Sequence, residues 1–155
     1  MEKAGKKVWK RQIKETATAI LEKRIAGSVL AMNQAQESAN SEDKSSAGDK
    51  YETSRSMGQR DRDMYAGQLA QARQELAFLN NIDTEMLHEN AGTGTVIFTG
   101  KLVFFIALGL GMADLNDRKI VFLSAQAPLA GVLKTKKKGS TFLLNGQELE
   151  ILELF

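Results

Sequence analysis

Two acidic residues, Asp49 and Glu52, stand where a polar loop gives way to a helix-forming stretch. Three residues apart at a helix N-terminus, they would lie on one face. Carboxylates are the hard oxygen ligands that Mg²⁺ prefers, and this ion keeps several of its own waters. The pair is therefore a candidate partial site for a divalent metal, and Glu42 and Asp43 in the same loop could assist it.

The same spacing has a structural alternative. Asp49 can be the N-cap or a first-turn acid of a helix, with Glu52 as its capping-box partner, and neither role needs a metal. Lys44, Lys50 and Arg55 would also neutralise part of the negative charge of the pair. The residues alone leave the metal site and the helix cap both open.

Composition limits the function classes. The 155 residues, 43% hydrophobic and 26% charged, suffice for one domain or two small units. The chain has no cysteine, which excludes disulfides and thiolate metal sites, and its single histidine argues against a His-rich zinc site. The longest apolar run, residues 102–112, is too short for a transmembrane helix. We expect no membrane partner and a cytoplasmic protein.

Two long stretches have the periodicity of amphipathic helices, residues 6–38 and residues 49–82. In the second stretch the apolar stripe is Met57, Met64, Leu69, Ala72, Leu76 and Leu79. Residues 40–48 between the two stretches are polar and rich in turn formers. The pattern predicts an antiparallel coiled-coil hairpin over residues 1–82, with an acidic tip near residues 40–52.

Residues 83–155 have a different pattern, in which β-branched and aromatic residues are punctuated by Gly and Asn. Residues 127–133 predict a short helix with Pro128 in its first turn. Asn145-Gly146 predicts a tight hairpin turn, and residues 114–117 predict another turn. The expected strands are residues 94–99, 101–108, 120–124, 141–144 and 149–154. The predicted fold class is α+β, with the hairpin followed by a small, mostly antiparallel sheet domain.

The chain resembles the bacterial Gre transcript-cleavage factors, in order, over most of its length. Gly48-Asp49-x-x-Glu52 is similar to the hairpin tip of that family. Ala127-Pro128-Leu129-Ala130 and then Lys137-Lys138-Gly139 resemble its Ser-Pro-Leu-Ala helix and the basic turn after it. The chain departs from the family pattern at Ala127, where Ser is usual, and at Ser140, where Asp is usual. With these departures, the chain resembles a divergent branch of the Gre family.

The resemblance implies an FKBP-like C-terminal domain and a monomer that binds bacterial RNA polymerase through its secondary channel. It implies that Pro128, Leu129 and Lys138 contact the polymerase. It also implies that Asp49 and Glu52 help to hold a catalytic Mg²⁺ beside the nascent RNA 3′ end, only in the polymerase complex. The protein would then be a transcription elongation factor that stimulates RNA cleavage by the polymerase and is not an enzyme alone.

Two other functions stay open. A Gre-like regulator could occupy the channel without cleavage, and a coiled-coil adaptor could bind other proteins. A peptidyl-prolyl isomerase, which an FKBP-like fold would suggest, is disfavoured because residues 83–155 contain no Tyr or Trp to line a pocket. Residues 1–39 hold eight Lys or Arg against four Glu, a basic excess that is typical of a solvated helix face.

Overall fold

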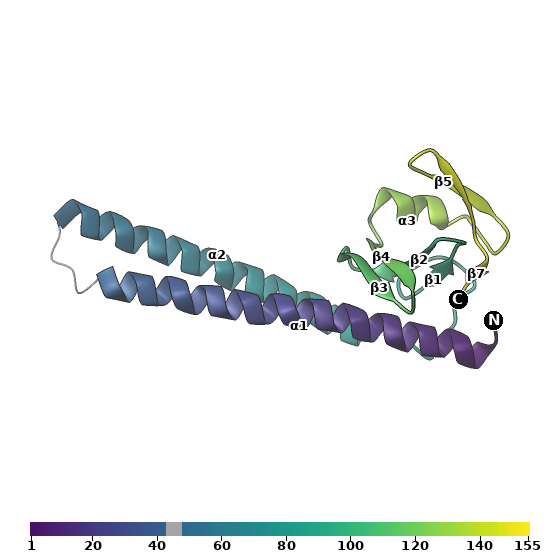
Figure 1. Cartoon of the computed structure of the whole chain (residues 1–155), viewed down its shortest axis with the longest axis horizontal. Coiled ribbons are helices and arrows are strands. Elements are labelled where there is room, and N and C mark those ends of the chain that lie inside the picture. Colours follow the sequence, from purple (N-terminus) through teal and green to yellow (C-terminus); the bar gives the residue numbers. More distant parts are fainter. Residues whose placement is uncertain (43–47) are drawn as a thin grey trace. The chain divides into compact units, whose positions relative to one another are not determined.

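The computed structural model describes the backbone of residues 1–42 and 48–155 and the side chains of residues 1–41 and 52–155. Two long helices, α1 (Lys3–Glu42) and α2 (Gly48–Asn80), lie side by side as a hairpin (Figure 1). A mixed β-sheet domain with one short helix follows them. The predicted α+β class is confirmed. Of the helices in the described ranges, none combines the length and the apolar character needed to cross a membrane.

The chain divides into two compact units. The hairpin unit is Ile20–Ala77, and the sheet unit combines Met1–Ala19 with Phe78–Phe155. The start of α1 and the end of α2 therefore belong to the sheet unit.

Small residues form the seam of the hairpin unit near its loop. A Cβ built on Gly58 would lie 3.1 Å from Ala39 Cβ and 3.3 Å from Ala39 Cα. The helices approach so closely here because the position has no side chain. The prediction that Met57 and Met64 pack in this seam is wrong, since their exposed fractions are 59% and 50%. Both side chains lie on the solvent-exposed surface of α2 instead.

The sheet unit contains a five-stranded sheet in the order β3-β4-β2-β1-β7. Its strands are β1 (Val96–Phe98), β2 (Leu102–Ala107), β3 (Gly111–Leu115), β4 (Arg118–Ser124) and β7 (Glu153–Leu154). Strands β5 (Thr141–Leu144) and β6 (Gln147–Glu150) form a separate hairpin, and α3 (Pro128–Leu133) precedes them. All pairings are antiparallel except β2 with β4, which is parallel.

Strand β2 is covered on both faces of the sheet, since five of its six residues are buried. The register places Phe104 beside Ile97, and Phe104 packs into one core with Leu133 of α3, Phe142 and Ile151. Residues next to these in each strand, such as Phe98 beside Ile97, point to the opposite face of the sheet. There Trp9 of α1 lies edge-on against Phe98, with ring centroids 4.9 Å apart. The first turns of α1 therefore cover the face of the sheet that α3 leaves open.

Two predicted tight turns have the expected backbone. Asn145 and Gly146 have φ angles of 50° and 78° and join β5 to β6. Asn116 and Asp117, at 51° and 61°, join β3 to β4. The predicted turn over residues 114–117 is too wide, because Asp114 and Leu115 belong to β3. The pairing of Asp114 with Lys119 and of Leu115 with Arg118 extends the ladder to the turn.

The strand predicted over residues 149–154 is divided in two. Ile151 donates its backbone N–H to Ser140 O, whereas Leu152 donates to Phe98 O, at 2.9 and 2.8 Å. The chain thus leaves the β5–β6 hairpin at Ile151 and joins the large sheet as β7. The backbone changes its hydrogen-bond partner between two adjacent residues, so one strand is not maintained.

Candidate functional site

The predicted tip lies at the start of α2, which begins at Gly48. Glu52 is exposed on this helix, and its carboxylate faces solvent. The side chain of Asp49 lies outside the described residues, as do those of Glu42 and Asp43. Among the side chains that are described, no three acids or histidines come together as a metal site. Two carboxylates suit Mg²⁺ as part of a site that a partner completes, and this role stays a prediction.

The three residues expected to contact a polymerase belong to two features of the sheet unit. Pro128 is exposed at the first position of α3, preceded by Ala127 in an extended conformation (φ −63°, ψ 144°). Leu129 is half-buried and packs against the core. Lys138 lies in the turn after α3 and forms a salt bridge of 3.1 Å with Glu153. Pro128 and Lys138 are thus both exposed, and Lys138 already has a salt-bridge partner.

Three cationic groups, from two segments of the chain, surround the carboxylate of Glu153. Its carboxylate accepts hydrogen bonds from the Met1 amino group at 3.0 Å and from Lys138 at 3.1 Å, and Lys6 Nζ lies 3.3 Å away. The Met1 amino group, followed by Lys138 and Lys6, lowers the pKa of Glu153 to about 2 against the opposing effect of burial. Lys6 also lies over the Phe155 ring, 5.5 Å from its centroid. The cluster ties the start of α1 to β7.

Two lysines of α1 hold the segment that follows α2. The Lys14 ammonium group donates to Ile82 O at 2.8 Å and to Asn80 O at 3.1 Å. Asn80 is the last residue of α2 and Ile82 follows two residues later, so Lys14 lies at the helix C-terminus, where cations are favourable. Lys10 is 1% exposed and donates to Met86 O at 2.7 Å. The side chain of Lys10 is thus a buried cation, which the sequence analysis did not identify.

Burial lowers the pKa of Lys10 to about 8, although the negative charge of Asp83 acts in the opposite direction. The pKa of His88 is also lowered, by burial first and by the nearby Lys10 charge second. Perturbed titrations often mark active sites. Here the almost complete burial of Lys10 prevents contact with a substrate, so we assign Lys10 a structural role.

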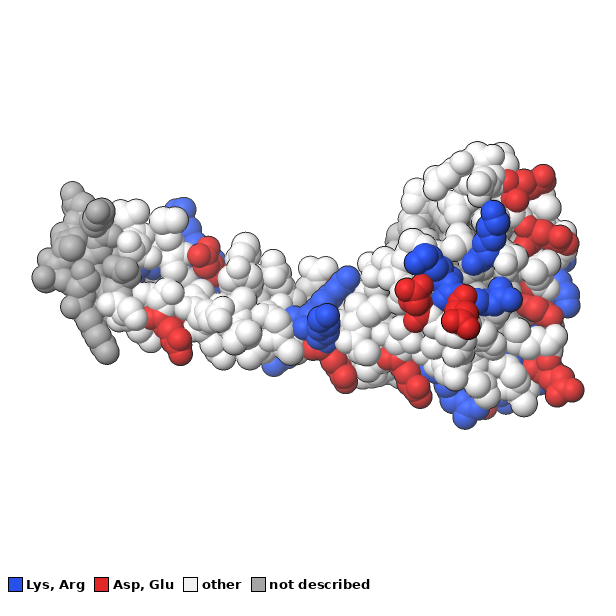
Figure 2. Space-filling view, in the orientation of Figure 1, with Lys and Arg blue, Asp and Glu red and all other residues white. Residues whose placement is uncertain are grey.

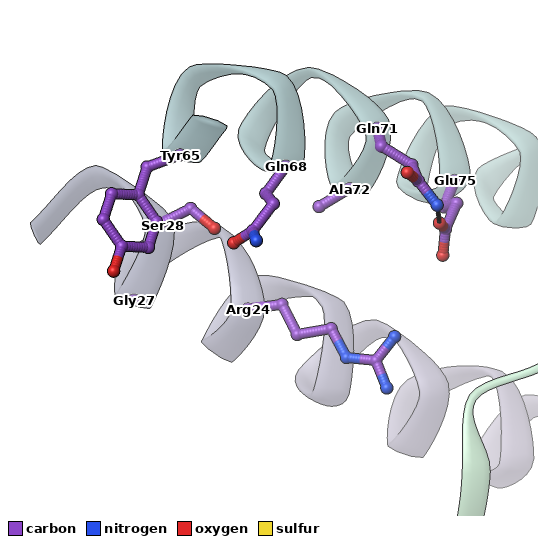
Figure 3. Close-up of a pocket in the computed structure, with 8 residues that line it drawn as sticks. All are labelled: Arg24, Gly27, Ser28, Tyr65, Gln68, Gln71, Ala72 and Glu75. Carbon is purple, nitrogen blue, oxygen red and sulfur yellow. Dashed lines mark hydrogen bonds between the residues drawn. The ribbon is translucent and has the colours of Figure 1, made fainter. Parts of the chain in front are cut away.

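A hollow of about 370 Å³ opens between α1 and α2 in the hairpin unit (Figure 3). Its lining residues are Arg24, Gly27, Ser28, Tyr65, Gln68, Gln71, Ala72 and Glu75. Ser28 and Gln68 point toward each other across the gap in Figure 3, and Gln71 donates to Glu75 at 3.0 Å on the α2 wall. The hollow exists because Gly27, Ser28 and Ala72 are too small to fill the seam.

The two walls of this hollow carry opposite charges. Arg24 stands on the α1 wall and forms no ion pair with any side chain that the structure describes, whereas Glu75 stands on the α2 wall. Their charges are not joined by a salt bridge within one chain.

A second hollow, of about 450 Å³, lies in the sheet unit between the β1–β2 turn and β6. It is lined by Gly100, Lys101, Gln147, Glu148, Leu149, Glu150 and Leu152. Figure 2 shows many charged side chains on the visible face of the sheet unit. The second hollow offers no grouping of catalytic side chains beyond one lysine and two glutamates.

Comparison with known proteins gives no relative for this chain. No protein-family model matches it. No curated protein and no solved structure match it either. Functional argument therefore depends on the residues and on the fold.

Proposed function

We propose that the chain is a Gre-type regulator that binds bacterial RNA polymerase through the secondary channel and promotes cleavage of backtracked RNA. One observation supports this most. Helices of 40 and 33 residues form a hairpin whose second helix begins with Gly48-Asp49-x-x-Glu52, and a mixed sheet domain with a short helix led by Pro128 follows. A 33-residue helix spans about 50 Å, a length that can reach into a protein channel.

Asp49 and Glu52 have the central role in this proposal. In the polymerase complex their carboxylates supply oxygen ligands and negative charge beside the nascent RNA 3′ end. A Mg²⁺ bound there would activate the attacking water and stabilise the leaving oxygen. The exposure of Glu52 supports the proposal, because its carboxylate is open to a partner. The protein assists the polymerase and does not cleave RNA alone.

The sheet unit supplies the anchor in this proposal. Pro128 and Leu129 at the start of α3 would contact the polymerase, and Lys138 would add a positive charge beside them. The proposal includes an FKBP-like fold for this unit and a cytoplasmic location. A coiled-coil adaptor is the alternative if the polymerase does not bind.

Backtracked elongation complexes of bacterial RNA polymerase, with labelled RNA and Mg²⁺, test the proposal. We expect the wild-type protein to release short 3′ fragments, and Asp49→Ala and Glu52→Ala to bind the polymerase without releasing them. Asp63→Ala is the matched control, since Asp63 is an exposed acid of α2 away from the tip. If Asp63→Ala releases 3′ fragments as wild type does, the loss of cleavage in the other two variants is due to the tip carboxylates.

The second candidate function is occupation of the channel without cleavage. Lys44, Lys50 and Arg55 surround the acidic pair in the sequence, and their charge favours this alternative. It predicts that wild type binds and inhibits the polymerase, with no 3′ fragments. Absence of any binding would overturn both polymerase proposals.

A further inference from the structure

Two glycines lie inside the long helices without a packing reason for their small size. A Cβ built on Gly27 of α1 or on Gly67 of α2 would meet no atom within 4 Å beyond the adjoining part of its own helix. Both residues have ordinary helical backbone rather than a positive φ. Glycine disfavours a helix about fivefold relative to alanine. These two positions therefore weaken their helices and gain no close contact in return.

The two weak positions lie at nearly the same height along the hairpin. Ala39 lies against Gly58, and the helices are antiparallel (Figure 1). Gly27 precedes Ala39 by 12 residues, and Gly67 follows Gly58 by nine. At a rise of about 1.5 Å per residue, the two glycines differ in height by about 4.5 Å, which is less than one helical turn. Both helices are thus weakest at one level.

The seam is also poorly filled at this level. Ser28 and Ala72 are buried there and line the hollow of about 370 Å³. Among the described side chains of residues 24–30 and 67–73, Leu69 is the only large apolar one that is buried. Segments with few buried apolar contacts open at a lower free-energy cost than well-packed ones. The packing between the helices therefore does little to keep them straight here.

Polar groups in the hollow can satisfy backbone groups that bending would free. Gly/Ser pairs and the entry of water into the backbone hydrogen-bond ladder are two usual causes of helix kinks, and α1 contains the pair Gly27-Ser28. Gln68 is exposed and points toward Ser28 across the hollow (Figure 3). Tyr65 also lines the hollow and carries a hydroxyl group. Solvent and side chains thus lower the cost of a bend.

We propose a hinge within the hairpin, about which its tip half bends relative to its base half. The hinge residues are Gly27, Ser28, Gly67 and Ala72. Hinges are typically a few residues, often small, that absorb a change in backbone angles. The hollow supplies the space that the two helices need when they move toward each other. One hinge thus accounts for both the unexplained glycines and the unfilled seam.

The tip half moves as one piece in this proposal. A Cβ on Gly58 would lie 3.3 Å from the Ala39 backbone, so the helices are in close contact between the hinge and the tip. In a polymerase channel, such a hinge would let the tip adjust its direction. The inference does not rest on the proposed polymerase function, because each measurement uses the free chain. The failure of either proposal therefore leaves the other intact.

Hydrogen exchange of backbone amides in the full-length chain gives the first test. The amides to compare are those of the hinge turns, residues 27–31 and 67–71, and those nearer the tip, residues 34–39 and 58–62. We expect the hinge turns to exchange at least about tenfold faster, because they open locally. Simple fraying of the hairpin from its tip predicts the opposite order. Exchange that slows steadily from the tip to the base overturns the proposal.

Alanine at the two glycines should remove the hinge. Gly27→Ala and Gly67→Ala should each slow the exchange of the adjoining hinge amides about fivefold, which is the ratio set by helix propensity. The amides nearer the tip should slow much less. Gly5→Ala is the matched control, since it makes the same change near the start of α1, where the new Cβ lies 3.5 Å from Met1 Cγ. Equal slowing along the whole hairpin would mean that it opens as one unit, contrary to a hinge.

Spin labels measure the bending itself, since the chain has no native cysteine. Glu15→Cys and Glu37→Cys place labels at exposed positions of α1 on either side of the hinge. They lie about 33 Å apart along a straight helix. The distance distribution should be broad, with a shorter component, and should become narrow when Gly27→Ala and Gly67→Ala are added. Circular dichroism checks that the labelled chains stay helical. Equally narrow distributions in both proteins rule out the hinge.

Discussion

The ammonium group of Lys10 donates a 2.7 Å hydrogen bond to the backbone carbonyl of Met86, across 76 residues of sequence. The bond fixes the segment after α2 against α1. An unpaired buried cation is costly, and a hydrogen-bonded one much less so. Asp83 also stabilises the charge of Lys10. The hydrogen bond between Lys10 and Met86 therefore connects α1 to the segment that leads into the sheet.

Lys10→Met should raise the pKa of His88 toward its ordinary value. Burial is the larger cause of the depression and remains, but the repulsion from the Lys10 charge is removed. The chain has one histidine, so one imidazole signal in an NMR pH titration reports the change. Lys14→Met is the control and should leave the titration of His88 unchanged. Equal shifts in both variants would contradict a specific effect of Lys10.

Lys10 should also make the free energy of unfolding rise with pH in alkaline solution. Its pKa is about 8 in the folded chain and 10.5 in the unfolded chain. Between these values the unfolded state binds more protons, so stability increases as the pH rises. The gain over Lys10→Met should be on the order of 1–3 kcal/mol between pH 8 and 10.5. Urea unfolding at several pH values measures it, and parallel curves for the two proteins would refute the prediction.

Glu153 should make the protein lose stability in acid. Its folded pKa is about 2 and its ordinary value is 4.5, so the stabilisation is present above pH 4.5 and is lost as the pH falls from 4.5 to 2. Glu153→Gln should cost about 1 kcal/mol at neutral pH after allowance for solvent screening. Thermal unfolding at pH 7 and pH 3 measures both effects. Glu150→Gln, an exposed neighbour, should change neither.

Local patterns explain why the helices and turns were predictable. The apolar period of residues 6–38 and 49–82 predicts helices, and α1 and α2 begin and end within four residues of those bounds. Asn145-Gly146 predicts a tight turn because both residues tolerate positive φ. Each of these signals is contained within a few neighbouring residues.

Pairing across the chain was not predictable in this way. The parallel ladder joins Leu102 to Lys119 and Ala107 to Ser124, and β2 gives the continuous apolar run that a strand buried on both faces shows. That run was identified as a strand without its partner. The change of sheet at Ile151 depends on contacts with Phe98, far away in sequence.

The candidate sites also differ in whether neighbouring residues or distant contacts define them. Local spacing alone indicates Asp49 and Glu52, and their role in metal binding stays a prediction. Lys10 appeared as one of several lysines on a basic helix, because its burial depends on Met86 and Asp83. The hollow between α1 and α2 depends on which small residues face each other across the seam. No single segment of sequence contains that information.

Gly58 and Gly67, two glycines of α2, should respond oppositely to the same substitution. Alanine is favoured over glycine in a helix by about 1 kcal/mol, and Gly67→Ala should gain most of this because nothing lies within 4 Å of its Cβ position. At Gly58 the new Cβ would lie 3.3 Å from the Ala39 backbone. Such overpacking costs about 1–3 kcal/mol, so Gly58→Ala should destabilise the hairpin overall.

Thermal or urea unfolding followed by helical circular dichroism compares the two variants directly. The midpoint should fall for Gly58→Ala and rise for Gly67→Ala. A variant that combines Gly58→Ala with Ala39→Gly should recover much of the loss, because it removes the Cβ that the new methyl group contacts. A rise for Gly58→Ala would mean that the helices separate at little cost, contrary to the close packing of Gly58 against Ala39.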